Sequence, residues 1–104
     1  MLMVTSDLIP GREIDSTLGL VVGNAVRARH LGRDVLASLK NLVGGEIGAY
    51  QQLLSESRAQ ALERMEKQAE DMGADAVVAV RISTSSIANA ASEVLAYGTA
   101  VKLR

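Results

Sequence analysis

The stretch Ala49–Ile82, AYQQLLSESRAQALERMEKQAEDMGADAVVAVRI, decides the fold class because its hydrophobic period changes once, at Gly73. Before Gly73, apolar side chains recur at helical spacing and fill one arc, which predicts a helix over Ala49–Met72. The arc comprises Tyr50, Leu53, Leu54, Ala61, Leu62, Met65, Ala69 and Met72. After Gly73, the run Ala76–Ile82 is almost continuously apolar and rich in valine, which is typical of a strand covered on both faces. The stretch therefore predicts a long helix followed by a buried strand.

The residues before this stretch predict two strands. Met1–Thr5 is expected to form a short strand, and Asp7–Gly11, which contains Pro10 and Gly11, is expected to form a turn. A long β-like stretch follows from about Glu13 to Ala28. One of its faces carries Gly19 and Gly23, and glycines in a strand indicate a bulge or the close approach of another backbone. A packed helix or a neighbouring subunit would both satisfy that expectation.

Three further segments complete the predicted topology. Asp34–Val43 has helical spacing and ends at Gly44 and Gly45. Ser83–Ser92 is rich in Ser, Ala and Asn, and we interpret it as a mobile connection or a frayed hairpin end. Glu93–Leu103 alternates as a strand does. Two sets of its residues point to opposite faces: Leu95, Tyr97, Thr99, Val101 and Leu103 are expected to face the core, while Ala96, Gly98 and Ala100 are expected to leave the other face bare.

The predicted element order is β-β-α-α-β-β over a single domain, residues 1–104. This order favours a two-layer α+β fold, with one curved, mainly antiparallel sheet and one long helix across it.

The composition excludes several kinds of site. The chain has 104 residues, a net charge of −1, no cysteine and one histidine. Disulfides, thiolate metal sites, thiol nucleophiles and iron–sulfur clusters are therefore absent. No apolar run approaches the roughly 20 residues of a membrane span, and the N-terminal residues do not follow the pattern of a signal peptide. We expect a cytoplasmic protein that engages neither membranes nor nucleic acid.

The apolar residues suggest a subunit of a homo-oligomer. The chain is 48% hydrophobic but only 2% aromatic, since Tyr50 and Tyr97 are its only aromatic residues. Val, Leu, Ile, Ala and Met must then supply the core, and several strand faces carry only small side chains. We therefore expect neighbouring copies to cover part of the apolar surface.

Several motifs resemble the YbjQ-like family. They are Arg33–Asp34, Asn41–Gly45, Gly48–Tyr50, Ser57–Arg58, Gly73–Val78 and Gly98–Lys102. The resemblance implies a small α+β subunit similar to that of dodecin, assembled into a ring, with a homopentamer as the expected size. The family carries the label "putative heavy-metal-binding" without an established activity, so the resemblance leaves the biochemical function unknown.

The sequence offers a set of candidate ligand-binding residues, which we expect to lie between subunits. They are Arg33, Asp34, Gly44, Gly45, Tyr50, Arg58 and Asp75. Arg58 falls inside the apolar arc, and a buried guanidinium requires a partner such as Asp34 or Asp75. It is interpreted either as a structural ion pair or as an anion-binding arginine in an inter-subunit pocket.

Two of the other candidate sites have competing structural interpretations. Gly44 and Gly45 are interpreted as the end of one helix and the turn to the next. The alternative is a loop whose backbone amides bind an anion. Tyr50 is interpreted as a core or interface anchor.

Metal binding is the second functional hypothesis and catalysis is the third. His30 is the candidate metal ligand, because a ring would bring several copies of it together; the alternative is a histidine in a surface turn. No catalytic triad order stands out, so an enzyme with an inter-subunit site is kept only as an alternative. The favoured interpretation is a non-enzymatic, ring-forming subunit with a scaffold or ligand-binding role.

Overall fold

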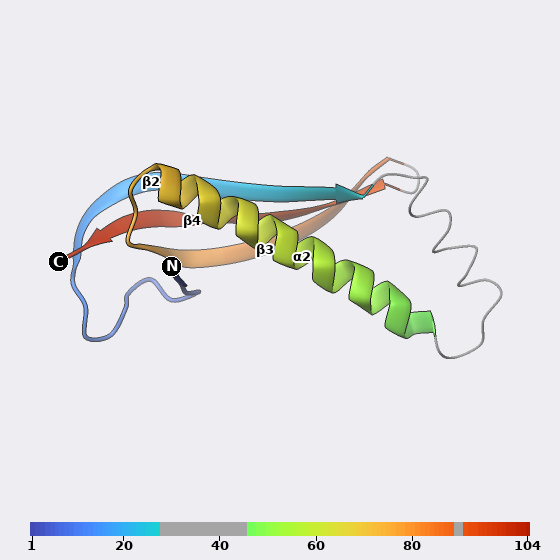
Figure 1. Cartoon of the computed structure of the whole chain (residues 1–104), viewed down its shortest axis with the longest axis horizontal. Coiled ribbons are helices and arrows are strands. Elements are labelled where there is room, and N and C mark those ends of the chain that lie inside the picture. The colour runs from blue at the N-terminus through green and yellow to red at the C-terminus, as the bar shows by residue number, and fades with distance from the viewer. Residues whose placement is uncertain (28–45, 89–90) are drawn as a thin grey trace.

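In the computed structural model of the protein, one long helix lies across one face of a four-stranded sheet (Figure 1). The structure describes residues 1–27, 46–88 and 91–104, and the side chains of 1–26, 54–86 and 92–104. Its elements are β1 (Leu2–Met3), β2 (Ile14–Arg27), α2 (Glu46–Asp71), β3 (Ala76–Ala88) and β4 (Ala91–Leu103). The predicted helix over Asp34–Val43 lies outside the described residues.

The sheet has the order β1-β3-β4-β2 and is mainly antiparallel, as predicted. β4 pairs antiparallel with both β2 and β3, whereas β1 pairs parallel with β3. Of the two interpretations of Ser83–Ser92, a mobile connection or a hairpin end, the structure supports the second. The two strands stay paired through Ser86 and Ser92 and on to Ala88 and Ala91, so this segment is the end of a long hairpin.

The predicted helix is confirmed, and it begins three residues earlier than expected. Its C-terminal end is closed by two hydrogen bonds, from Gly73 N–H to the Glu70 carbonyl (2.9 Å) and from Ala74 N–H to the Ala69 carbonyl (3.0 Å). Gly73 has a φ of 80°, the left-handed conformation that this helix-ending motif requires. The chain then enters β3.

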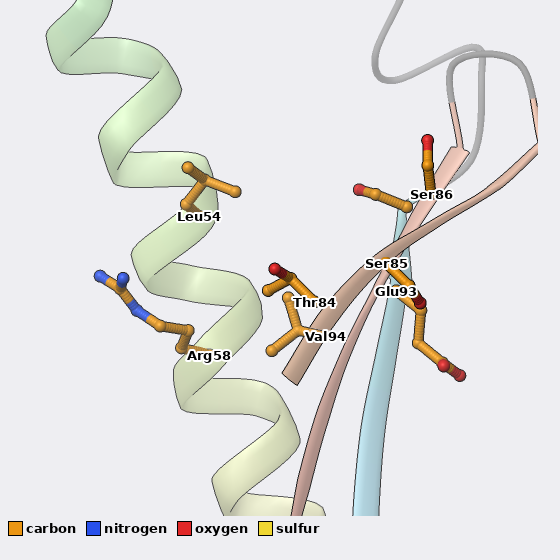
Figure 2. Close-up of a pocket in the computed structure, with 8 residues that line it drawn as sticks. Leu54, Arg58, Thr84, Ser85, Ser86, Glu93 and Val94 are labelled. Carbon is orange, nitrogen blue, oxygen red and sulfur yellow. The ribbon is translucent and has the colours of Figure 1, made fainter. Parts of the chain in front are cut away.

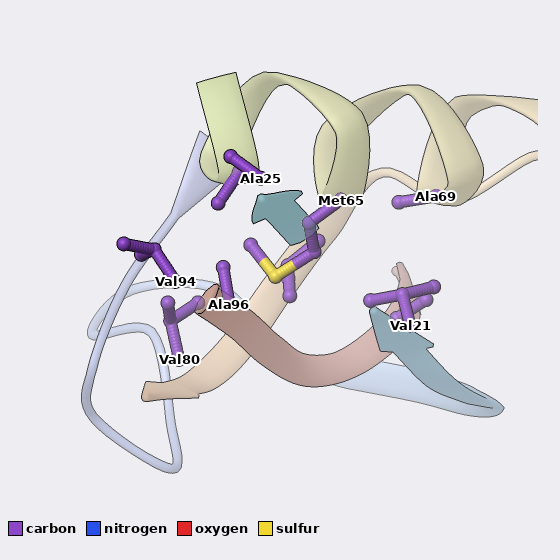
Figure 3. Packing of buried hydrophobic residues seen from close by; sticks show 10 residues of the cluster. Val21, Ala25, Met65, Ala69, Val80, Val94 and Ala96 are labelled. Atoms are coloured by element: carbon purple, nitrogen blue, oxygen red, sulfur yellow. The ribbon is translucent and has the colours of Figure 1, made fainter. Parts of the chain in front are cut away.

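The main core lies between α2 and the sheet. Ala61, Met65 and Ala69, which follow one another at intervals of four residues, are fully buried against β2, β3 and β4. Figure 3 shows Met65 pointing into the space between Val21, Ala25 and Ala96.

Both explanations offered for glycine in β2 are realised, at different positions. Gly19 has a φ of 132° and lies at a shift in the pairing register between β2 and β4, which is a β-bulge. Gly23 lies directly under α2, where a Cβ atom would meet the carbonyl oxygen of Ala61 and the amide nitrogen of Met65. The backbone that approaches this strand is therefore that of the helix.

The predicted inward face of β4 is wrong over most of its length. Ala96, Gly98 and Ala100 are buried beneath α2 and against β3, while Tyr97 points to the opposite, open face. The physical reason is the short distance between the helix backbone and the sheet, which only small side chains allow. The larger residues of β4 consequently lie on the face that α2 does not cover.

A second, smaller core covers one end of that other face. Ile9, from the turn Asp7–Gly11, packs there with Ala76, Val78 and Val101, and Leu103 contacts the same cluster. Val101 and Leu103 thus do contact a core, although not the one beneath α2. The turn itself is confirmed by the hydrogen bond from Arg12 N–H to the Ile9 carbonyl (3.1 Å).

Candidate functional site

The face of the sheet opposite α2 carries an open apolar surface. Val22 pairs with Tyr97 in the antiparallel register, and residues directly opposite each other point to the same face. Leu20 and Val26 alternate with the buried residues of β2 and share this face. The exposed fractions are 67% for Leu20, 38% for Val22, 47% for Val26 and 36% for Tyr97. We call these four residues the open patch.

Two side chains of α2 occupy the outer edge of β2. The Val22 N–H donates to Gln68 Oε1 at 2.6 Å, and Arg64 Nη1 donates to the Asn24 carbonyl at 2.6 Å. Edge strands with free backbone groups invite pairing with another chain, and side chains that occupy these groups reduce that tendency. The open patch, rather than this part of the edge, is therefore the surface left for association.

A cavity of about 440 Å³ lies between α2 and the β3–β4 hairpin (Figure 2). Leu54 and Arg58 line it from α2, and the hairpin contributes the rest of the wall: Thr84, Ser85, Ser86, Ser92, Glu93 and Val94. The cavity exists because α2 diverges from the hairpin toward its N-terminal end, as Figure 1 shows. Register places Thr84 opposite Val94 and Ser86 opposite Ser92.

Arg58 lies beside this cavity and is exposed, so its predicted burial is wrong. Its guanidinium donates to Ser55 Oγ at 3.0 Å, and among the described residues it forms no ion pair. The apolar arc fails to bury Arg58 because the buried face of α2 runs through Ser57, Ala61, Met65 and Ala69, and Arg58 lies to the side of it.

Asp75 does not pair with Arg58 either. It lies at the start of β3, where Asp75 Oδ2 accepts the Leu103 N–H at 2.8 Å and Oδ1 lies 3.4 Å from Lys102 Nζ. The Leu103 N–H has the largest effect and lowers the pKa of this carboxyl below its ordinary value; desolvation opposes it, and Lys102 lowers the pKa further. Asp75 is therefore a structural connection between the turn after α2 and the end of β4.

The remaining predicted site residues are not brought together by the described part of the structure. His30, Arg33, Asp34, Gly44 and Gly45 lie outside the described residues, and Tyr50 belongs to α2 without a described side chain. Sequence reasoning missed the hydroxyl groups that line the cavity. Their signal was the density of Ser and Thr in Ser83–Ser92, which was interpreted as a sign of mobility.

The metal-ligand chemistry of the chain does not fit a soft heavy metal. Such ions prefer thiolates and then imidazoles, and the chain has no cysteine and one histidine. Within the ranges that the structure describes, no three His, Asp or Glu side chains gather into a group able to hold a metal ion.

Among the same residues, no helix has the length and apolar character to cross a membrane.

Comparisons with known proteins agree on one family. A family model described as "Putative heavy-metal-binding" (YbjQ) matches residues 1–104. A UPF0145 protein of Fervidobacterium nodosum is 55% identical over 104 residues, which cover 100% of this chain and 96% of the relative. A UPF0145 protein of Archaeoglobus fulgidus is 53% identical over 104 residues, with the same coverage of both chains.

One solved structure shares the fold. It is a protein with unknown function of the DUF74 family from Pediococcus pentosaceus. The TM-score is 0.66 at 15% sequence identity, and the match covers 100% of this chain and 98% of the other.

Proposed function

Because the chain belongs to the YbjQ-like, UPF0145 family, we propose that it acts as a non-enzymatic, ring-forming subunit of a homo-oligomer. A second copy covers the open patch, and the assembly supplies the scaffold on which any inter-subunit ligand is held. The observation that carries the proposal is the exposure of Leu20, Val22, Val26 and Tyr97 on one face of the sheet.

The apolar residues of this face favour a copy of the same chain, because apolar surface gains about 25 cal/mol for each Å² removed from water. The same face also carries the hydrogen bond between Asn24 and Glu93, which would lie at such an interface. Association that closes into a ring leaves no copy with a bare patch, whereas association that does not close gives filaments. Five copies remain the expected number, on the basis of the family resemblance alone.

The mass of the particle in solution tests the proposal, measured by light scattering after size-exclusion chromatography. We expect a single species with several times the mass of the chain. Leu20→Glu should shift it toward the monomer, because a buried interface does not tolerate an unpaired carboxylate. Leu8→Glu is the matched control, since Leu8 is 69% exposed and lies in the N-terminal turn rather than on β2 or β4.

Two results would contradict the proposal. The first is a folded wild-type protein that remains monomeric at working concentrations. The second is an oligomer whose mass is unchanged by Leu20→Glu while circular dichroism shows an intact fold. A mass that Leu8→Glu reduces as strongly as Leu20→Glu does would also move the interface away from the open patch.

The metal-binding function in the family description is not the favoured candidate, because the donor set of this chain does not suit soft metal ions. An enzymatic role has no observation in its favour within the described residues.

A further inference from the structure

We propose that the cavity between α2 and the β3–β4 hairpin binds a small organic carboxylate with a short apolar tail. The site lies within one chain, so it goes beyond the proposed assembly and does not depend on it.

The first argument concerns charge. Arg58 contributes a full positive charge at the cavity, and its one hydrogen bond among the described residues is to the neutral Ser55 Oγ, one turn earlier in α2. Glu93, the acidic residue among the lining side chains, accepts a hydrogen bond from Asn24 Nδ2 at 3.1 Å instead. Figure 2 shows Glu93 pointing away from Arg58. Arg58 is also turned away from the hairpin in Figure 2, but it is bonded to a neighbour on its own helix, whereas Glu93 is bonded across the sheet to Asn24. The charge that can turn into the cavity is therefore the positive one, which favours an anion.

The second argument concerns hydrogen bonding. Thr84, Ser86 and Ser92 line the cavity, and register places them on the face of the hairpin that α2 covers farther along. Their hydroxyl groups form no hydrogen bond with other described residues. Each hydroxyl can donate to an oxygen anion. Three neutral donors and one guanidinium match the four lone-pair sites of a carboxylate.

The third argument concerns the apolar part of the wall. Leu54 of α2 and Val94 of β4 both line the cavity, and Figure 2 shows them on its two sides. The volume of about 440 Å³ falls in the range of roughly 300–1,000 Å³ that is usual for small-molecule sites. A charged head with a short aliphatic tail would use both kinds of wall.

Binding requires one local change. The guanidinium of Arg58 is turned away from the hairpin in Figure 2, and it must rotate about its side-chain bonds to meet the carboxylate. Exposed side chains change rotamer within nanoseconds. A carboxylate offers the guanidinium an opposite charge and two acceptor oxygens, whereas the Ser55 hydroxyl that it replaces is a single neutral acceptor.

Hexanoate is the probe, added to the ¹⁵N- and methyl-labelled protein and followed by NMR. We expect saturable shifts at the Leu54 and Val94 methyl groups and at the Ser86 and Ser92 amides. Hexylammonium should cause none of these shifts, because its charge is opposite. Acetate should bind at least tenfold more weakly than hexanoate, because it lacks the tail.

The variants distinguish the contribution of the Arg58 guanidinium to binding from an effect of the net charge of the protein. Arg58→Gln should weaken hexanoate binding at least tenfold, and Arg58→Lys should restore part of it. Arg12→Gln, at an exposed arginine in the N-terminal turn, should leave binding unchanged. Ser92→Leu, which fills the cavity without changing charge, should abolish binding.

Three outcomes would overturn the proposal: no saturable shifts with hexanoate, equal binding of hexylammonium, or equal losses in Arg58→Gln and Arg12→Gln. The Leu20→Glu variant distinguishes this site from the assembly. Its hexanoate affinity should match that of the wild type even where its mass falls to that of the monomer.

Discussion

At Gly23 the backbone of α2 approaches the sheet so closely that no Cβ atom fits. A Cβ atom there would meet backbone atoms of Ala61 and Met65, which cannot move without the whole helix. We expect Gly23→Ala to destabilise the protein by about 3 kcal/mol, the upper part of the range for overpacked cores. Urea unfolding followed by circular dichroism measures the change.

Gly11→Ala is the control for this prediction. Gly11 has a φ of 82° and open space around its Cα, so the variant has only backbone strain to overcome. That strain amounts to about 1–2 kcal/mol. If Gly23→Ala were no more destabilising than Gly11→Ala, the close packing of α2 on β2 would be wrong.

Ala79 is a non-glycine residue in a left-handed conformation that favours glycine, with a φ of 55°. It lies at the register shift of β3, where its N–H donates to the Ser6 carbonyl at 2.9 Å. Glycine adopts this conformation without the steric penalty. We therefore expect Ala79→Gly to leave the free energy of unfolding unchanged or raise it, by up to about 1 kcal/mol.

The matched control is Ala96→Gly in β4, where the backbone is extended and the methyl group is buried. This variant should lower the free energy of unfolding by about 1 kcal/mol or more. Thermal unfolding of both variants measures the change in stability. A loss of stability in Ala79→Gly as large as that in Ala96→Gly would contradict a strained conformation at Ala79.

At the scale of single residues, sequence spacing predicted which residues share a face but not how far they are buried. Ala61, Met65 and Ala69 were placed correctly, and Ser57, four residues before Ala61, is buried as well although it was not assigned to the arc. Arg58 was assigned to the arc and yet is exposed. The apolar positions define a wide arc, and their spacing does not tell which part of that arc is buried.

At the scale of elements, Asp75 joins the turn after α2 to the end of β4. The Leu103 N–H that donates to it lowers its pKa from the ordinary value of 3.8. A carboxyl whose pKa is lower in the folded than in the unfolded state stabilises the protein fully above the unfolded value. The contribution is lost as the pH falls through the folded value.

We therefore expect Asp75→Asn to lower the thermal midpoint at pH 7, and its difference from the wild type to shrink as the pH falls below about 3.8. Asp7→Asn, in the N-terminal turn, serves as the control and should show no such convergence. A deficit of Asp75→Asn that stays constant from pH 7 to pH 2.5 would disprove the role of the charged carboxyl.

The order of the elements was easier to predict from the sequence than which face of each element is buried. The change of period at Gly73 located both α2 and β3. The inward face of β4 was assigned to its larger residues, on the assumption that larger apolar side chains are buried more. The close approach of α2 reverses that assignment, because Ala96, Gly98 and Ala100 are what a nearby helix backbone permits.

At the scale of the whole molecule, the scarcity of aromatic residues correctly predicted a core of small side chains. The largest fully buried side chains among the described residues are Met65, Val21, Val77, Val101 and Ser57. The same composition predicted association between copies, and the open patch supports that expectation. The number of copies is a property of an interface geometry that one chain's sequence does not specify.

The donor atoms available to the whole assembly bear on the family's metal label. Each copy brings one imidazole, His30, and no thiolate, however many copies meet. Zn²⁺, Cu²⁺ and Cd²⁺ should therefore bind weakly, at about millimolar concentrations, in calorimetric titrations of the intact oligomer. His30→Ala should leave these titrations unchanged. If the wild type bound a metal tightly and His30→Ala removed that binding, histidines from several subunits of the ring would bind one shared metal ion.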